Sequence, residues 1–414
     1  MLEQVVSTRV ARSLRGSGGN VFGEGFDALS IHLGSRGYAA RCIYDYLWIV
    51  AKFGAWLKRK KIILKTISEG TTKDFLKGFV SSPSRRARAA GLRHLLVVLR
   101  ERGLVRPRRA QPVTPAHKIT AAYGAYLHEN RGLQSATIVW HIAYVRDFLT
   151  HAKVENAADL RRISGDHIRG FIAQIAQRYT PGSVKNVTKA LRGFLRFLQV
   201  TKGFRTAGLL AAVPSIREWK LAGVPKYLTD DQLHRVLASF DVSTSSGLRD
   251  RAIAVCIADL GLRSIEVAHL SLDSIDWSAG TIRVDAGKSA RDSELPLPTS
   301  VGRALVAYLR HGRPVTATRR VFVQDRAPVG EPLLPGSIGA TMKRAFKRAG
   351  VTVSPGGAHA LRHTAATRML RAGANIKEIA DILRHRSIDT TAIYAKVDLV
   401  RLQEVALPWP MAGQ

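Results

Sequence analysis

Apolar residues recur every three or four positions through most of the chain, the period of helices that bury one face. Ile43, Leu47 and Val50 form such a stripe in a helix that starts after Gly37. The same period predicts further helices over 71–80, 84–101, 247–260, 299–310, 336–349, 360–372, 376–384 and 389–395. Residues 1–25 show little periodicity and contain Gly-Ser-Gly-Gly, so we expect a weakly ordered lead-in there.

One stretch in the C-terminal half has a different period. Residues 281–285 and 293–297 alternate apolar and polar positions around Ala-Gly-Lys-Ser-Ala-Arg, which predicts a β-hairpin. The fold class predicted for the whole chain is therefore mainly α with a small antiparallel sheet, the sheet lying in an α+β C-terminal domain.

Two proline-containing linkers, at 111–117 and 211–226, divide the chain. We expect four parts. They are an N-terminal helical module at 1–110, a second helical domain at 115–212, a C-terminal domain at 226–400 and a short tail at 401–414.

The two helical parts repeat one plan. Ile43 corresponds to Ile138, Phe75 to Phe171 and Leu92 to Leu191, at offsets of 95, 96 and 99 residues. Three blocks in one order indicate a duplicated module of about 90 residues. A chance alignment of two amphipathic bundles is the alternative.

The strongest feature of the composition is charge. The chain has 64 Lys and Arg against 31 Asp and Glu, a net charge of +33 that is heaviest toward the N-terminus. A folded protein with this field attracts a polyanion, and nucleic acid is the first candidate. A ribosomal-type or membrane-surface partner would fit the charge alone.

Basic stripes on the two helical modules are candidates for DNA contact, although a solvated helix face is the usual reason for such a pattern. The residues that we select are Arg85, Arg86, Lys185, Lys189, Arg192 and Arg196.

Several classes of protein are excluded. No uncharged apolar run reaches the ~18 residues of a membrane span, and the first residues lack the apolar region of a secretory signal. Cys42 and Cys256 are the only cysteines, which excludes a disulfide framework and a cysteine zinc site. We expect a cytoplasmic protein that is not attached to a membrane.

The C-terminal part carries residues suited to chemistry on a phosphate. His359 and Arg362 lie one helical turn apart, and His385 and Tyr394 follow. A guanidinium matches phosphate oxygens as a bidentate fork, and a tyrosine oxygen forms a covalent intermediate if a base takes its proton.

Two earlier motifs complete the set. Gly261-Leu-Arg-Ser-Ile-Glu266 places Arg263 and Glu266 three residues apart, and Lys288 stands in the predicted hairpin turn. The order Arg263, Lys288, His359, Arg362, His385, Tyr394 has spacings of 25, 71, 3, 23 and 9 residues.

This set resembles the signature of the tyrosine recombinases, the phage integrase family. The match has one departure, because the family's Leu-Gly-His is Leu383-Arg384-His385 here, with Arg386 after it. The glycine lets the backbone turn or approach DNA closely. Arg384 puts the geometry of that turn in question, and Arg384 and Arg386 are further candidates for a phosphate contact.

The resemblance implies the role of each residue. Arg263 and Arg362 would hold the scissile phosphate, with Glu266 orienting Arg263. Lys288 would donate a proton to the leaving 5′ oxygen.

The remaining roles concern the nucleophile. Tyr394 would become a 3′-phosphotyrosine after His359 accepts or relays its proton, and His385 would bond a phosphate oxygen. We interpret His363 as a structural helix contact. The three histidines lack an acidic or cysteine partner at ligand spacing, so we predict no metal and no cofactor.

The family further implies a clamp around double-stranded DNA, with four protomers on two DNA sites. We predict a site-specific recombinase, an integrase or transposase-like enzyme of a mobile element, with sibling recombinases or accessory proteins as further partners. The alternatives are a dimer-resolving recombinase, a type IB topoisomerase-like enzyme and a DNA-binding accessory factor without turnover. A metal-dependent nuclease would need a carboxylate cluster that the sequence does not show.

Overall fold

A computed structural model describes residues 13–79, 82–107, 114–156, 158–217, 225–285, 293–353, 356–385 and 387–397. It is mainly helical with one three-stranded antiparallel sheet, which confirms the predicted fold class. No helix within the described ranges is long and apolar enough to cross a membrane.

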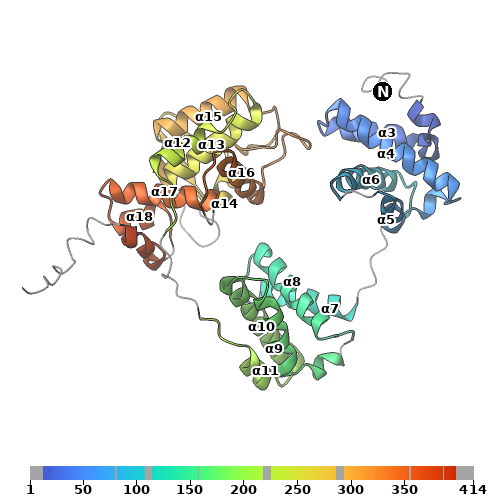
Figure 1. The fold of residues 1–414 in the computed structure, drawn as a ribbon, viewed down its shortest axis with the longest axis horizontal. Helices are drawn as coiled ribbons and strands as arrows, with labels where there is room; N and C mark the ends of the chain where they lie inside the picture. Colours follow the sequence, from blue (N-terminus) through green and yellow to red (C-terminus); the bar gives the residue numbers. More distant parts are fainter. Residues whose placement is uncertain are drawn as a thin grey trace, which may run out of the picture. The chain divides into compact units, whose positions relative to one another are not determined.

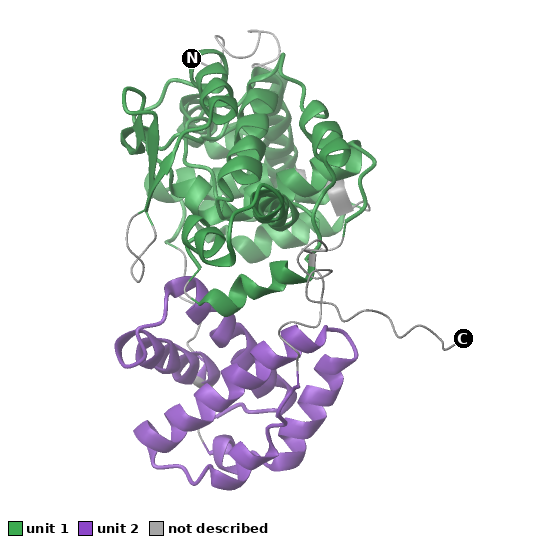
Figure 2. Cartoon of the chain, turned by 90° about the vertical axis from the view of Figure 1, so that its left-hand side faces the viewer, with its two compact units in different colours: residues 1–107, 221–414 green, residues 108–220 purple. Residues whose placement is uncertain are grey.

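The chain divides into two compact units (Figure 2). Residues 108–220 form one, and residues 1–107 together with 221–414 form the other. Separate apolar cores lie in the N-terminal helices, in the helices of the 108–220 unit and in the C-terminal residues. The finer division into four parts stays a prediction.

The N-terminal helices are amphipathic and enclose one core (Figure 1). They are η1 (Gly19–Phe22), α3 (Glu24–Ser35), α4 (Ala40–Arg59), η2 (Leu64–Thr66), α5 (Glu69–Lys77) and α6 (Ser82–Glu101). The stripe of Ile43, Leu47 and Val50 faces this core and is at most 1% exposed.

The expectation of a weakly ordered lead-in is wrong from residue 13 onward. Phe22 and Phe26 are each 1% exposed in the core. A Cβ at Gly18 would overlap the backbone of Ala51, and a Cβ at Gly54 would overlap Gly18. The glycines that suggested a loose segment therefore let this segment pack directly against α4. Residues 1–12 lie outside the described residues.

The unit of residues 108–220 repeats the order of these elements. It contains α7 (Pro115–Glu129), α8 (Ser135–His151), η3 (Asp159–Arg162), α9 (Gly165–Ala176), α10 (Pro181–Lys202) and α11 (Ala207–Ala212). In both modules a long helix leads through a short 3-10 turn to a serine-capped helix, α5 after Ser68 and α9 after Ser164. The shared order supports the predicted duplication.

The C-terminal residues surround the apolar helix α13 (Ser245–Leu260), which packs against α15 and α17. The other elements are α12 (Asp230–Ala238), α14 (Ser264–His269), η4 (Leu272–Ser274), α15 (Thr299–His311), α16 (Pro335–Arg348), α17 (Ala358–Arg371), α18 (Ile376–Ile382), η5 (Ile388–Thr390) and η6 (Ala392–Val397). Thr229 caps α12 in a capping box with Gln232.

The sheet contains β1 (Ile275–Asp276), β2 (Thr281–Val284) and β3 (Ser293–Pro296) in that order. Ile282 pairs with Leu295 in the β2–β3 ladder, which confirms the hairpin. The predicted helix at 389–395 forms instead as the 3-10 turns η5 and η6.

Candidate active site

Arg263 and Glu266 come together at the start of α14. The carboxylate of Glu266 accepts hydrogen bonds from the backbone N–H of Arg263 and from its Nη1, each at 2.7 Å. Glu266 is 7% exposed, whereas the side chain of Arg263 is 39% exposed. Glu266 thus holds a guanidinium that keeps one side open, the arrangement expected of an orienting carboxylate.

Arg362 reaches the same carboxylate from α17. Its Nη1 lies 3.9 Å from Glu266 Oε2, and its residue is 5% exposed. The guanidinium also donates to the carbonyl of Gly261 and, at 2.5 Å, to that of Leu383. Burial and the charge of Arg263 lower the pKa of Arg362. The site therefore holds two guanidiniums close together, and the single carboxylate of Glu266 does not neutralise their combined positive charge.

Gly261 and Arg384 show why the chain turns sharply at this site. Gly261 has a φ of 62°, and a Cβ there would overlap the side chain of Leu383. Arg384, where the family signature has glycine, has a φ of 54°. The backbone N–H of Arg384 donates to the carbonyl of Asp381, and that of His385 donates to the carbonyl of Ala380. This pair of hydrogen bonds is typical of an α-helix whose C-terminus is closed by one residue in the left-handed conformation. Arg384 thus adopts the turn that glycine would make.

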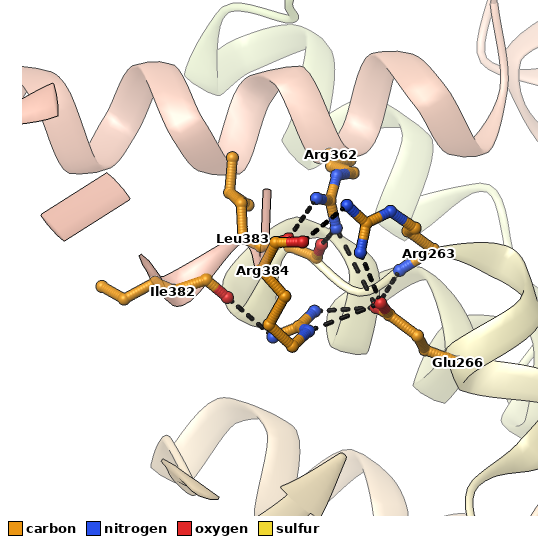
Figure 3. A network of polar contacts seen from close by, with 7 residues as sticks. Arg263, Glu266, Arg362, Ile382, Leu383 and Arg384 are labelled. Atoms are coloured by element: carbon orange, nitrogen blue, oxygen red, sulfur yellow. Dashed lines mark hydrogen bonds and ion pairs between the residues drawn. The ribbon is translucent and has the colours of Figure 1, made fainter. Parts of the chain in front are cut away.

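The guanidinium of Arg384 does not face solvent. Its side chain is 3% exposed and donates to Glu266 Oε2 at 2.7 Å and to the carbonyl of Ile382 at 2.7 Å. Arg263 in turn donates to the carbonyl of Arg384 at 3.0 Å. Arg384 therefore belongs to the arginine–carboxylate network of Figure 3, and in this structure it offers no free phosphate contact.

Tyr394 is buried in η6 at 1% exposure, in a small apolar cluster with Ala366, Leu370, Ile379 and Leu383. Its hydroxyl lies 2.8 Å from Nδ1 of His363. Burial raises the pKa of Tyr394 to about 12, and burial with the charges of His359 and Arg362 lowers that of His363 to about 4. In this structure Tyr394 is therefore a neutral phenol held by a neutral imidazole.

His363 is a site residue that the sequence reasoning missed. The prediction gave the tyrosine proton to His359, but the ring that contacts the hydroxyl is that of His363, one turn further along α17. His359 stacks on His363 with ring centroids 5.6 Å apart. The spacing of four residues placed His359 and His363 on one helix face, but it could not show which of the two rings meets the tyrosine.

His385 follows the left-handed turn and is half-buried. Its Nδ1 lies 2.6 Å from the hydroxyl of Thr391, which is fully buried. Burial, and then the charge of Arg362, lowers the pKa of His385 to about 4. This contact fixes the orientation of the ring through Nδ1. The other ring nitrogen, Nε2, is then the one that could donate a hydrogen bond to a phosphate oxygen.

Some predicted residues lie outside the described residues or away from this site. Lys288 and Arg386 are outside them. Arg85, Arg86, Lys189 and Arg196 are exposed on α6 and α10, and Lys185 is half-buried. Arg192 donates to the carbonyls of Val213 and Pro214, at 3.0 and 3.2 Å, so its guanidinium braces the chain after α11. Contact of these residues with DNA stays a prediction.

No cluster of three or more metal-ligating side chains exists among the residues that the structure describes. The chemistry that the described site can perform follows from its parts. Two guanidiniums stabilise charge on phosphate oxygens, a tyrosine supplies a nucleophilic oxygen, and imidazoles accept or donate protons. These groups together suit the transfer of a phosphate ester to a tyrosine oxygen.

Comparison with known proteins identifies the family. Residues 226–400 match the phage integrase family, and residues 121–202 match the N-terminal SAM-like domain of phage integrases. The provisionally named integrase/recombinase y4rA of Sinorhizobium fredii is 39% identical over 385 residues, 92% of each chain. The chain therefore belongs to the phage integrase family, the tyrosine recombinases, and is a DNA breaking-and-rejoining enzyme.

Solved structures show the same fold at lower identity. The XerH site-specific recombinase bound to a palindromic difH substrate is 18% identical, with a TM-score of 0.53 over 71% of this chain and 97% of that one. The Tn1549 transposon integrase in complex with a circular intermediate DNA is 16% identical, with a TM-score of 0.53 over 68% of this chain and 99% of that one.

Proposed function

We propose that the chain is the recombinase of a mobile element and that Tyr394 is its nucleophile. The observation that carries the proposal is the convergence of four distant segments. Arg263, Arg362 and the turn at 383–385 meet through Glu266 and backbone carbonyls, and α17 also brings His363 to the hydroxyl of Tyr394.

The reaction follows from these groups. The Tyr394 oxygen attacks the scissile phosphorus, a P–O bond forms, and the bond to the 5′ oxygen breaks. The tyrosine proton passes to Nδ1 of His363, and Lys288 protonates the 5′ oxygen. Arg263 and Arg362 stabilise the extra negative charge on the phosphate oxygens. The phosphotyrosine keeps the bond energy, so another strand's 5′ hydroxyl reverses the step.

DNA itself would activate this site. Without it, the pKa of Tyr394 is about 12 and that of His363 about 4, so proton transfer between them is strongly unfavourable. A phosphodiester places a negative charge beside the imidazole, which favours its protonated form. The resting enzyme is therefore protected from reaction by the same burial that positions its nucleophile.

We assign roles to the parts of the chain in the same proposal. Residues 115–212 bind the core DNA site, and 226–400 perform catalysis. Residues 1–110 bind further DNA or partner proteins, and 401–414 contact a neighbouring protomer. Four protomers assemble on two double-stranded DNA sites in the cytoplasm. The net charge of +33 and the names of the integrase/recombinase y4rA and the transposon integrase support the DNA partner and the mobile-element role.

Covalent trapping tests the proposal. Nicked suicide duplexes cut from the DNA flanking the gene are incubated in EDTA with the wild type, with Tyr394→Phe and with Tyr179→Phe, whose side chain lies on the surface. We expect a protease-sensitive adduct at a DNA 3′ end for the wild type and Tyr179→Phe alone. An adduct that persists in Tyr394→Phe would overturn the nucleophile. Specific binding without any adduct would favour the accessory-factor alternative.

A further inference from the structure

One carboxylate lies among three guanidiniums in the active site. Glu266 accepts two bonds from Arg263 and two from Arg384, at 3.4 Å from Nε and 2.7 Å from Nη2. Arg362 approaches it to 3.9 Å. Figure 3 shows the three side chains arranged around the carboxylate. Three positive charges against one negative charge leave two in excess within this cluster.

Arg384 differs from Arg263 in its exposure, and it differs from the similarly buried Arg362, whose side chain is 6% exposed, in being hydrogen-bonded to Glu266. The side chain of Arg263 is 39% exposed, whereas that of Arg384 is 3% exposed. The guanidinium of Arg384 donates to Glu266 and to the carbonyl of Ile382. Arg384 therefore adds a positive charge whose direct partner is the carboxylate of Glu266.

Arginine is an unusual residue for the backbone conformation at position 384. Residue 384 has a left-handed φ, which glycine adopts freely and which strains other residues. The side chain is held in place despite that strain, and its buried ion pair is the compensating interaction that the structure shows.

The negative charge of Glu266 interacts with the positive charges of Arg263, Arg362 and Arg384. With glycine at 384, the carboxylate would face Arg263 and Arg362 alone and would cancel half of their combined charge. With Arg384 bound, its charge is matched by a residue that takes no part in phosphate contact. The field that the phosphate experiences from the cluster then corresponds to two positive charges in place of one.

We propose that Arg384 is a positioning residue that neutralises Glu266, so that Arg263 and Arg362 keep their full charge for the scissile phosphate. The inference rests on the proposed strand-transfer function. The backbone of the same turn contributes, because Arg263 donates to the carbonyl of Arg384 and Arg362 to that of Leu383.

A set of four variants tests the proposal on the suicide duplexes. Arg384→Gly removes the charge and keeps the turn, and Arg384→Lys keeps the charge. Glu266→Gln and the double variant Arg384→Gly/Glu266→Gln complete the set. The measurements are the single-turnover rate of adduct formation, DNA affinity and the melting temperature.

We expect Arg384→Gly to form the adduct about tenfold to a hundredfold more slowly with DNA affinity unchanged, because Glu266 then offsets part of the charge of Arg263 and Arg362 and their alignment is lost. Arg384→Lys should retain more of the rate than glycine. Glu266→Gln should slow the wild type but speed Arg384→Gly, because in that background it removes the unmatched negative charge.

The reversal of sign separates an electrostatic role from a structural one. If Arg384 served only to build the turn, glycine would react at the wild-type rate, and that result would overturn the inference. Glu266→Gln slowing both backgrounds would also overturn it. A wild type that binds the duplex and never forms an adduct would refute the proposed function, and the inference with it.

Discussion

The hydroxyl of Tyr394 lies 2.8 Å from Nδ1 of His363, one turn along α17 from His359. The imidazole that contacts the proposed nucleophile is thus that of the histidine that follows Arg362 directly in the sequence. Arginine and imidazole project from adjacent positions of one helix, so a shift of α17 would displace the phosphate clamp and the base together.

Replacing His363 tests its role. We expect His363→Ala to slow adduct formation on a suicide duplex about a hundredfold, the lower range for loss of a general base. His359→Ala should slow it less, because its ring reaches the tyrosine through His363. His311→Gln, on an exposed histidine of α15, serves as the matched control and should react normally. Equal effects at 359 and 363 would contradict this assignment.

Stability should depend on pH through two half-buried histidines, His363 and His385. His363 and His385 have pKa values of about 4 in the folded protein, against an ordinary 6.5. The unfolded chain therefore binds more protons between these values, and the free energy of unfolding falls as pH drops from about 6.5 to about 4. The contribution is fully present above pH 6.5.

Chemical denaturation across that range measures the effect. His363→Gln and His385→Gln should each flatten the dependence of the free energy of unfolding on pH, because each removes one site that protonates on unfolding. Parallel curves for the wild type and both glutamine variants would show that these imidazoles titrate normally when folded.

Gly54 should resist substitution. A Cβ there would meet the backbone of Gly18, so we expect Gly54→Ala to lower the free energy of unfolding by about 1–3 kcal/mol, the cost of overpacking. Gly34→Ala is the matched control, because a Cβ at that helical position meets nothing within 4 Å. It should be neutral or stabilise by up to ~1 kcal/mol. Urea titration monitored by circular dichroism compares the two.

The basic face of α10 should act through phosphates. Lys189 and Arg196 are exposed on this face. If each contacts one phosphate of duplex DNA, Lys189→Ala and Arg196→Ala should each make the negative slope of log affinity against log salt shallower by about 0.9. Fluorescence anisotropy at several salt concentrations measures the slope. Arg192→Ala should leave that slope unchanged and lower the melting temperature, because its guanidinium bonds the carbonyls of Val213 and Pro214.

Periodicity predicted most helices and the hairpin because those elements bury one face. It failed at residues 13–23, where glycines serve close packing, and at 389–395, where the chain forms 3-10 turns around Tyr394. The motif spacing indicated which residues carry the chemistry. It could not indicate that Arg384 is buried on Glu266 or that His363 faces the tyrosine, because both contacts depend on side-chain direction across distant segments.

The carbonyls that anchor Arg362 belong to Gly261 at the end of α13 and to Leu383 at the end of α18. Helix C-termini carry partial negative charge, so the backbone acts as part of the counterion for the buried guanidinium. No point mutation can delete a carbonyl. A substitution at position 261 or 383 would therefore affect this support only through the path of the main chain, so the electrostatic support of the site depends little on which side chains stand there.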